Sequence, residues 1–251
     1  MLLPAKGQDV AAIKQAQCRN RLLATASAED FARLAPHLEP MKLGRGHVLV
    51  QPEQTIEHVY FLESGIGSIV AISPEGQECE AGIFGIDGVA PLAPAMGSDR
   101  SPHRFLIQVA DDSVRIASAA FVEALAASAS LRDLILRYAH VLGVQTGFTA
   151  LSNAVHPIDE RLARWLLMCH DRHTSNEIPI THEFMSLMLA VRRPSVTTSL
   201  HILEGNGFIR AERGHITIRN RQALEDFASD AYGKPEAEYR RLIGPLSAAH
   251  S

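Results

Sequence analysis

A hydroxyl-rich segment that begins at Pro194 carries the side chains best suited to contact a nucleic acid. Pro194 favours the first turn of a helix, so we expect a helix over residues 194–204, ended by glycine at 205. Arginine can make bidentate bonds to guanine or phosphate, and short hydroxyl side chains let a helix backbone approach DNA closely. The candidate contact residues in and before this helix are Arg192, Arg193, Ser195, Thr197, Thr198, Ser199 and His201.

The flanking residues complete a recognisable pattern. Thr181 is expected to cap a short helix at 182–189, and a tight turn follows at 190–193. A short helix, a turn and a polar-faced helix form a helix-turn-helix, whose second helix enters the major groove. Strands at 208–210 and 215–218 then predict a hairpin, or wing. This adds Thr181, His182, Arg213 and His215 to the expected DNA contacts; the alternative is a solvent-facing helix with an incidental hairpin.

Charge is concentrated in the same region. The 251 residues have a formal net charge of −4, but residues 181–221 contain six arginines and three glutamates, a net charge of +3. A local basic patch on an acidic protein suits a DNA reader that must also release its site. An ordinary solvated helix face would give the same charge pattern.

The residues that precede this region read as a β domain followed by a long helix. Ser27 is expected to cap a helix within 20–36. Short apolar runs separated by turn residues predict an antiparallel sandwich or barrel. The expected strands are 48–50, 58–62, 66–72, 80–84, 105–109 and 113–116, with a loop or short helix at 87–102.

A helix opened by Ser130 and running to about residue 155 carries an apolar stripe at steps of three, four and seven residues. Such a stripe can pack on the β domain or pair with its copy in a second chain, since a near-heptad seam indicates dimerisation. The expected dimerisation residues are Leu131, Leu134, Ile135, Tyr138, Val141, Leu142, Gln145, Phe148 and Ser152.

The dipeptide His156-Pro157 ends this helix and marks a domain boundary. The next helix, from Ile158, places Trp165 on its apolar face, where we expect it to be core. We therefore divide the chain into a β-roll at 20–128, a dimerisation helix at 129–155, a winged helix-turn-helix at 156–228 and a tail at 229–251. The tail is weakly patterned and either packs back on the body or moves freely.

The chain resembles transcription regulators of the Crp/Fnr family over about residues 20–227. The resemblance rests on Gly46 with Pro52-Glu53-Gln54, on 60–65 (YFLESG), on 159–163 (DERLA) and on the 181–209 block. It implies an α+β fold: an N-terminal antiparallel β-roll that is jelly-roll-like, a long dimerisation helix and a C-terminal winged helix-turn-helix. It further implies a homodimer on pseudo-palindromic double-stranded DNA, and leaves RNA polymerase open as a partner.

Position by position, Arg193 matches the first base-reading arginine of the family. Pro194 replaces a glutamate found in many members, and Thr198 replaces a second arginine. Each missing bidentate contact is worth about 1–3 kcal/mol of base discrimination. The protein is therefore not expected to read the operator of the best-known catabolite-activator members.

The resemblance also raises the question of an effector in the roll. Cyclic-nucleotide-binding members use a Gly-Glu pair and an Arg-Ser/Thr pair, and the matching positions are Gly85, Asp87, Arg100, Ser101 and Thr146. The shortened acid and the long spacing argue against a cyclic nucleotide, and a structural roll or another sensor is the alternative. Cys18 alone near the N-terminus excludes a Cys₄ iron–sulfur cluster within one chain. Haem would need ligands such as Cys79, His58 or His103.

Other function classes are less well supported. No nucleophile elbow, phosphate loop with its lysine or helical His pair indicates an enzyme. No apolar run is long enough to span a bilayer, and the N-terminus does not resemble a secretion signal, so we expect a cytoplasmic protein without a membrane partner. The remaining alternative is a ligand-sensing module whose winged helix contacts proteins.

Overall fold

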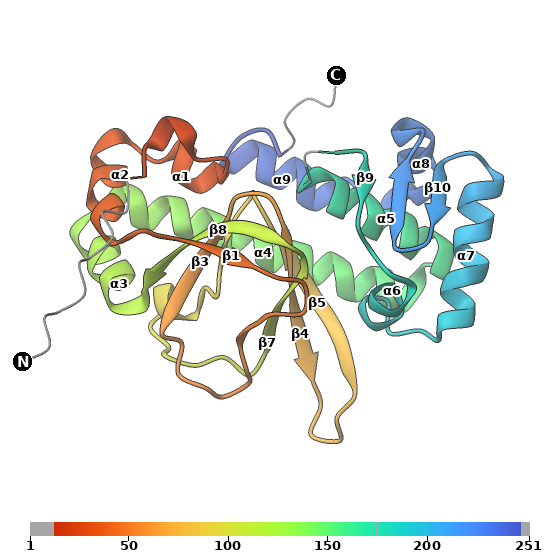
Figure 1. Ribbon diagram of the computed structural model, residues 1–251, viewed down its shortest axis with the longest axis horizontal. Helices are drawn as coiled ribbons and strands as arrows, with labels where there is room; N and C mark the ends of the chain where they lie inside the picture. Colours follow the sequence, from red (N-terminus) through yellow and green to blue (C-terminus); the bar gives the residue numbers. More distant parts are fainter. Residues whose placement is uncertain (1–12, 174, 247–251) are drawn as a thin grey trace, which may run out of the picture.

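A β-roll of two antiparallel sheets forms the N-terminal half of the computed structural model, which describes residues 13–173 and 175–246 (Figure 1). One sheet has the order β1-β8-β3-β6 and the other the order β2-β7-β4-β5. The strands are β1 (Glu39–Leu43), β2 (Val48–Val50), β3 (His58–Leu62), β4 (Ile66–Ile72), β5 (Glu78–Phe84), β6 (Val89–Ala90), β7 (Arg104–Val109) and β8 (Asp111–Ala117).

All six predicted strands are present, and three have the predicted bounds. The prediction missed β1 and β6. The first contains Pro40, which fits only an edge strand, and β1 is indeed at an edge of its sheet. The second has only two residues within the predicted loop, which also contains the 3₁₀ turn η3 (Ala93–Met96).

Successive side chains of β4 point to opposite faces of its sheet, one toward the interior of the roll and the other toward its outside. Ile69 faces the interior cluster with Phe84 and Ile107, whereas Ile66 and Val70 face the opposite side. Gly67 is required at its position, because a Cβ there would lie 2.2 Å from the Phe84 ring. The two faces of this sheet therefore serve two different cores.

The segment before the roll forms short helices rather than the one that we expected: η1 (Gln15–Gln17), α1 (Arg21–Thr25), α2 (Ala28–Leu34) and η2 (Ala35–His37). Ser27 caps α2 as predicted, by accepting the Asp30 amide. The Asn20 side chain caps α1 separately, which explains the break.

Two helices follow the roll, α3 (Ser118–Ala127) and α4 (Ala129–Val155). The cap of α4 is Ser128, whose hydroxyl accepts the Leu131 amide at 3.2 Å, and not Ser130 as predicted. The Ser130 hydroxyl instead donates to Asp30 at 2.7 Å. The long helix ends at His156-Pro157, as the sequence indicated.

The C-terminal region begins with α5 (Ile158–Asp171) and contains the predicted helix-turn-helix and hairpin. Its other elements are β9 (Glu177–Ile178), α6 (His182–Met188), α7 (Arg193–Gly205), β10 (Ile209–Glu212), β11 (His215–Ile218), α8 (Arg221–Ala228), η4 (Ser229–Ala231) and α9 (Lys234–Leu242). The strands form one sheet in the order β10-β11-β9, so the wing has a third strand that the sequence did not reveal.

One apolar core joins the winged helix to the roll. Ile66, Val70 and Ile83 of the roll belong to the same buried cluster as Leu166 of α5 and Met188 of α6. In Figure 1 this places α5 and α6 beside β4 and β5, and α7 at the far end of the molecule. The winged helix is thus fixed against the outer layer of the roll.

Candidate nucleic-acid interface

The turn between α6 and α7 sets the direction of the second helix. Thr181 caps α6 by accepting the Phe184 amide at 3.4 Å, as predicted. Ala190 adopts a left-handed φ of 50°, which reverses the chain within the turn. Arg192 is the N-cap residue of α7, and Pro194 stands in its first turn, where a missing amide costs nothing.

The inner face of α7 is apolar but includes one predicted contact residue. Val196, Leu200 and Leu203 are 0–1% exposed, as the sequence suggested. Ser199, however, is only 4% exposed and lies on this same face. Its assignment as a DNA contact is therefore wrong, because the residue at i+3 from Val196 points into the core.

The outer face of α7 is open to solvent. Arg192, Arg193, Pro194, Thr198 and His201 are exposed, and the remaining hydroxyl residues are half-buried. The hydroxyls of the two threonines donate to backbone carbonyls one turn earlier, at 3.1–3.2 Å. These hydroxyls retain lone pairs, so they can still accept a bond at the helix surface.

Arg193 forms an ion pair with a glutamate of the preceding helix. Its guanidinium lies 2.8 Å from the Glu183 carboxylate, and both side chains are more than half exposed (63% and 74%). Ion pairs in this environment contribute about 0–1 kcal/mol. A phosphate or a guanine edge can therefore replace Glu183 at low cost.

The wing stands beside the recognition helix. Gly214 adopts a φ of 84° at the hairpin tip, which only glycine does without strain. Arg213 at this tip is exposed, and His215 lies 3.8 Å from Glu177. The tip arginine is therefore available to a phosphate backbone.

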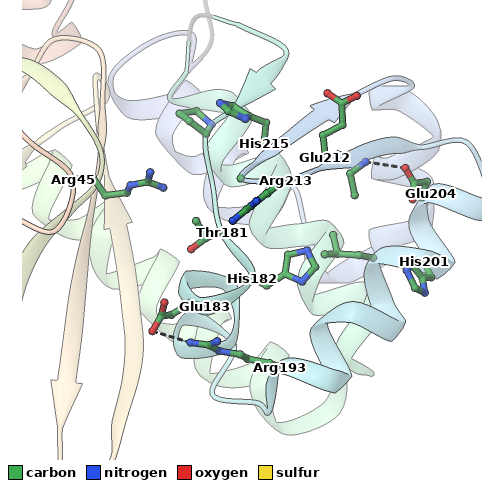
Figure 2. A pocket seen from close by; sticks show the side chains of 14 residues that line it. Arg45, Thr181, His182, Glu183, Arg193, His201, Glu204, Glu212, Arg213 and His215 are labelled. Carbon is green, nitrogen blue, oxygen red and sulfur yellow. Dashed lines mark hydrogen bonds and ion pairs between the residues drawn. The ribbon is translucent and has the colours of Figure 1, made fainter.

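These residues enclose a groove of about 920 Å³ (Figure 2). Arg193 and His201 border it from α7, and Arg213 from the wing. Arg45 borders it from the roll and points across it in Figure 2. The predicted contacts that line this groove are Thr181, His182, Arg193, His201, Arg213 and His215.

Arg45 is a basic lining residue that the sequence did not suggest. It stands in the turn between β1 and β2, next to Gly46 with a φ of 82°. No local pattern distinguishes it from any arginine in a surface turn. Only the placement of the winged helix against the roll brings it opposite Arg213.

A buried carboxylate lies where the winged helix meets the roll. The Glu80 carboxylate accepts bonds from the Ser68 hydroxyl at 2.5 Å, the Trp165 indole at 2.8 Å and the Gln108 amide at 3.0 Å. Desolvation raises the pKa of Glu80 to about 7, against the opposing effects of these bonds and of Arg164. Trp165 is core, as expected, but the sequence did not indicate its polar partner.

The five residues assigned to an effector pocket differ in burial and in hydrogen bonding. Asp87 accepts the Gly85 amide and the Arg172 guanidinium, both at 2.8 Å, so its carboxylate is already engaged. Ser101 is buried in the β6–β7 connection beside exposed Arg100. Thr146 is exposed on α4. The acid that was to hold the ligand is thus already engaged by Arg172, the C-cap residue of α5.

The predicted dimerisation stripe on α4 also faces inward. Tyr138 lies against Gly88, where a Cβ would be 1.9 Å from the tyrosine ring, and Gln145 bonds the backbone of Ile83 at 2.7 Å and 3.2 Å. Phe148 and Leu142 are half-buried, and the other members are 1–6% exposed: Leu131, Leu134, Ile135, Tyr138, Val141, Gln145 and Ser152. The chain's own roll and C-terminal helix thus cover seven of the nine predicted seam residues, which is the alternative packing that the stripe allowed.

The opposite face of α4 is open instead. Its apolar side chains Leu136, Leu151 and Val155 are 46%, 48% and 62% exposed. Gly143 and Gly147 lie on the same face, with no atom within 4 Å of an added Cβ. This face of α4 is therefore open to solvent, and no described residue covers its two glycines.

Within the described part of the chain, no cluster of three or more His, Cys, Asp or Glu side chains is arranged to hold a metal ion. None of the described helices is long and apolar enough to cross a membrane.

Comparison with known proteins agrees with this geometry. Residues 160–227 match the family of Crp-like helix-turn-helix domains. No curated protein matches the sequence. A helix-turn-helix is a binding module, which agrees with the prediction that the chain is not an enzyme.

Several solved structures are similar over most of the chain. FixK2 from Bradyrhizobium japonicum has a TM-score of 0.67 at 14% identity, covering 78% of this chain and 99% of that one. A CRP-family transcriptional regulator from Thermus thermophilus has a TM-score of 0.63 at 18% identity, covering 77% and 98%. The c-di-GMP responsive global regulator CLP from Xanthomonas campestris has a TM-score of 0.60 at 16% identity, covering 76% and 99%. The chain thus has the fold of Crp/Fnr-type transcription regulators, with a Crp-like helix-turn-helix domain at residues 160–227.

Proposed function

We propose that this chain is a homodimeric, sequence-specific transcription regulator that acts in the cytoplasm. The observation that carries the proposal is the exposed face of α7, where Arg193, Thr198 and His201 stand beside the wing residue Arg213. A helix of this kind reads base edges in the major groove, while a basic wing tip holds the phosphate backbone. The helix therefore supplies sequence preference and the wing supplies affinity.

Two copies would read a pseudo-palindromic site. Recognition helices of such dimers bind half-sites about 34 Å apart, which requires a fixed pairing of the chains. We assign this pairing to the open face of α4, around Leu136, Gly143, Gly147 and Leu151. Several of these positions are spaced by seven or eight residues, as in a helix–helix seam, and the glycines allow close approach.

An effector or partner at the roll would act through the shared core. Because Ile66, Val70 and Ile83 pack against α5 and α6, a change in the outer sheet is felt directly by the DNA-reading elements. CLP is described as c-di-GMP responsive, which makes cyclic dinucleotides the first compounds to add. A ligand would then favour one of two arrangements of roll and winged helix.

The decisive experiment selects bound sites from random duplex DNA, with and without small-molecule extracts and c-di-GMP. We expect enrichment of one inverted-repeat sequence. Absence of any enriched sequence at low salt would overturn the proposal and favour a module whose winged helix contacts proteins. An enriched single half-site would contradict the dimer alone.

The pairing face has its own test. Leu151→Glu places a charge on the open face of α4 and should convert the dimer to a monomer in sedimentation. Val122→Glu is the matched control, since Val122 on α3 is 43% exposed, close to the 48% of Leu151. Equal dissociation by both variants, or by neither, would contradict the assigned face.

A further inference from the structure

The C-terminal segment at residues 229–246, which we call the strap, lies beyond the matched helix-turn-helix domain and packs back on the protein. It contains η4, α9 and the following residues to Leu246. Ala231 and Tyr239 are each 1% exposed, and Glu236 and Leu246 are each 6% exposed. Burial of this extent in a terminal segment needs specific contacts, since ordering a chain end costs conformational entropy.

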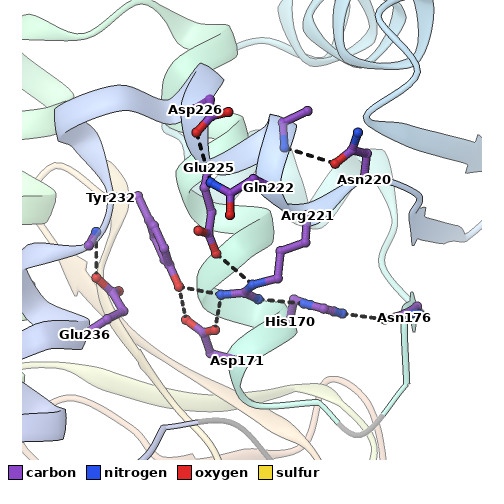
Figure 3. Close-up of polar contacts among 12 residues, drawn as sticks. His170, Asp171, Asn176, Asn220, Arg221, Gln222, Glu225, Asp226, Tyr232 and Glu236 are labelled. Atoms are coloured by element: carbon purple, nitrogen blue, oxygen red, sulfur yellow. Dashed lines mark hydrogen bonds and ion pairs between the residues drawn. The ribbon is translucent and has the colours of Figure 1, made fainter. Parts of the chain in front are cut away.

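The first anchor of the strap lies in the winged helix (Figure 3). The Tyr232 hydroxyl donates to Asp171 at the end of α5, at 2.7 Å. Arg221 at the start of α8 donates to Asp171 and to the Tyr232 oxygen, both at 2.7 Å. Burial raises the pKa of Asp171, and Arg221 opposes this, so the carboxylate depends on its partners.

The strap then turns toward the long helix. Gly233 adopts a φ of 108°, and its amide donates to the Glu236 carboxylate at 2.9 Å, which starts α9. Just before this turn, Asp230 lies 3.1 Å from His156, the residue that ends α4. The strap therefore passes directly beside the boundary between the long helix and the winged helix.

The second anchor lies in the roll. The Tyr239 hydroxyl donates to the Asp87 carbonyl at 2.7 Å, while the Asp87 carboxylate accepts Arg172 at 2.8 Å. A single loop residue of the roll is thus held by α5 and by α9 together. Both partners are almost fully buried, so water cannot replace these bonds.

The end of the strap packs against helices of the N-terminal segment and against α4. Leu246 belongs to the buried cluster that contains Leu22 and Phe31, and Leu242 packs against it. On the exposed side, Glu238 lies 2.9 Å from His140 of α4. The strap therefore connects the winged helix, the roll and the long helix within 18 residues.

We propose that the strap is a positioning element for DNA reading: it fixes the angle between the winged helix and α4, and hence the separation of the two recognition helices in a dimer. This inference rests on the proposed function. One base pair added between half-sites turns one of them by about 35° around the DNA axis, given 10–10.5 base pairs per turn. Rigidly held recognition helices cannot follow that rotation, whereas loosely held ones can.

The test measures binding of the full-length dimer to the selected site and to sites with one base pair added or removed. Wild type should bind the selected site about tenfold more tightly than the sites of altered spacing, because the second half-site adds to the affinity only when both recognition helices fit. Tyr239→Ala should reduce this preference to about threefold or less. The double variant Tyr232→Phe with Tyr239→Phe keeps both rings and should fall between the two.

The control variant is Arg240→Gln, which alters an exposed residue of the same helix. A second measurement needs no DNA, because the single tryptophan, Trp165, is 2% exposed where α5 meets the roll. Quenching of its fluorescence by acrylamide should increase in the Tyr239 variants and stay unchanged in Arg240→Gln. The double phenylalanine variant keeps the test valid if Tyr239→Ala does not fold.

The outcomes separate the two proposals. If wild type selects no DNA, the proposed function fails, and unchanged quenching would then also overturn the strap's holding role. If wild type shows a sharp spacing preference and the folded strap variants show the same preference, the inference fails alone. Tighter binding by the variants at every spacing would also overturn it, since the strap would then restrain DNA binding rather than position it.

Discussion

The outer and inner faces of the winged helix carry the same kind of ion pair, an arginine with a carboxylate, in opposite surroundings. On the outer face Arg193 lies 2.8 Å from Glu183, with side chains 63% and 74% exposed. On the inner face Arg172 lies 2.8 Å from Asp87, with side chains 4% and 2% exposed. The distance is the same, so the difference is access to water.

The difference in exposure to water suits the two arginines to different roles. An exposed pair contributes about 0–1 kcal/mol and exchanges readily for a phosphate. A buried pair loses its hydration on folding, and removal of one partner leaves an uncompensated charge. Arg193 is therefore suited to contact DNA, and Arg172 to hold the domain that presents it.

Loss of the inner arginine should have the largest effect. Arg172→Ala leaves the Asp87 carboxylate buried without its cation, and we expect the free energy of unfolding to fall by about 3–5 kcal/mol. Arg193→Ala is the matched control and should change it by less than about 1 kcal/mol. Urea denaturation measures both, and equal losses would contradict the contrast between the faces.

The buried Glu80 should make the inner face sensitive to pH. Its pKa is raised from 4.5 to about 7, so the folded protein keeps a proton that the unfolded chain releases. Glu80 therefore favours folding most below pH 4.5, and this contribution falls by about 3 kcal/mol as the pH rises to 7. Stability of wild type relative to Glu80→Gln, measured at several pH values, should decrease over that range. A parallel course of wild type and Glu80→Gln between pH 4.5 and 7 would contradict this prediction, because it would mean that folding does not raise the pKa of Glu80.

The outer face was more accessible to sequence reasoning than the inner one. Thr181 acts through a local capping bond, and Pro194 and Gly214 act through backbone preferences, so the helix-turn-helix and wing follow from the order of residues. Short apolar runs between turn residues likewise predicted β3 and β4. Local rules suffice where an element is defined by its immediate neighbours.

The inner face depends on contacts between distant segments. The sequence around Glu80 predicts a side chain on the solvent face of a strand. No residue near Asp87 indicates that Arg172, 85 residues later in the chain, is its partner. The apolar stripe on α4 was predicted from the sequence, but the pattern does not distinguish packing on the roll from packing on a second chain. Ser199 could have been found, since it follows Val196 by three residues, but its polar type suggested the outer face.

Base reading by the outer face should depend on Arg193. Arg193→Ala should lower discrimination at one base position by about 1–3 kcal/mol, because a bidentate contact is lost. Binding to the selected site and to singly substituted sites measures this. Arg33→Ala is the control, as Arg33 also pairs with an exposed glutamate at 2.8 Å, but on α2, away from the groove. Unchanged base preference in Arg193→Ala would remove this residue from the reading surface.

The smallest effect is expected at the wing. Arg213 stands at an exposed hairpin tip, where it can neutralise one phosphate without touching a base. Arg213→Ala should therefore weaken binding a few-fold on every sequence and reduce the slope of log affinity against log salt by about 0.9. Titrations of specific and scrambled duplexes at several salt concentrations measure both quantities. A loss confined to the specific duplex would instead place Arg213 on a base edge, and the division between a reading helix and a holding wing would have to be abandoned.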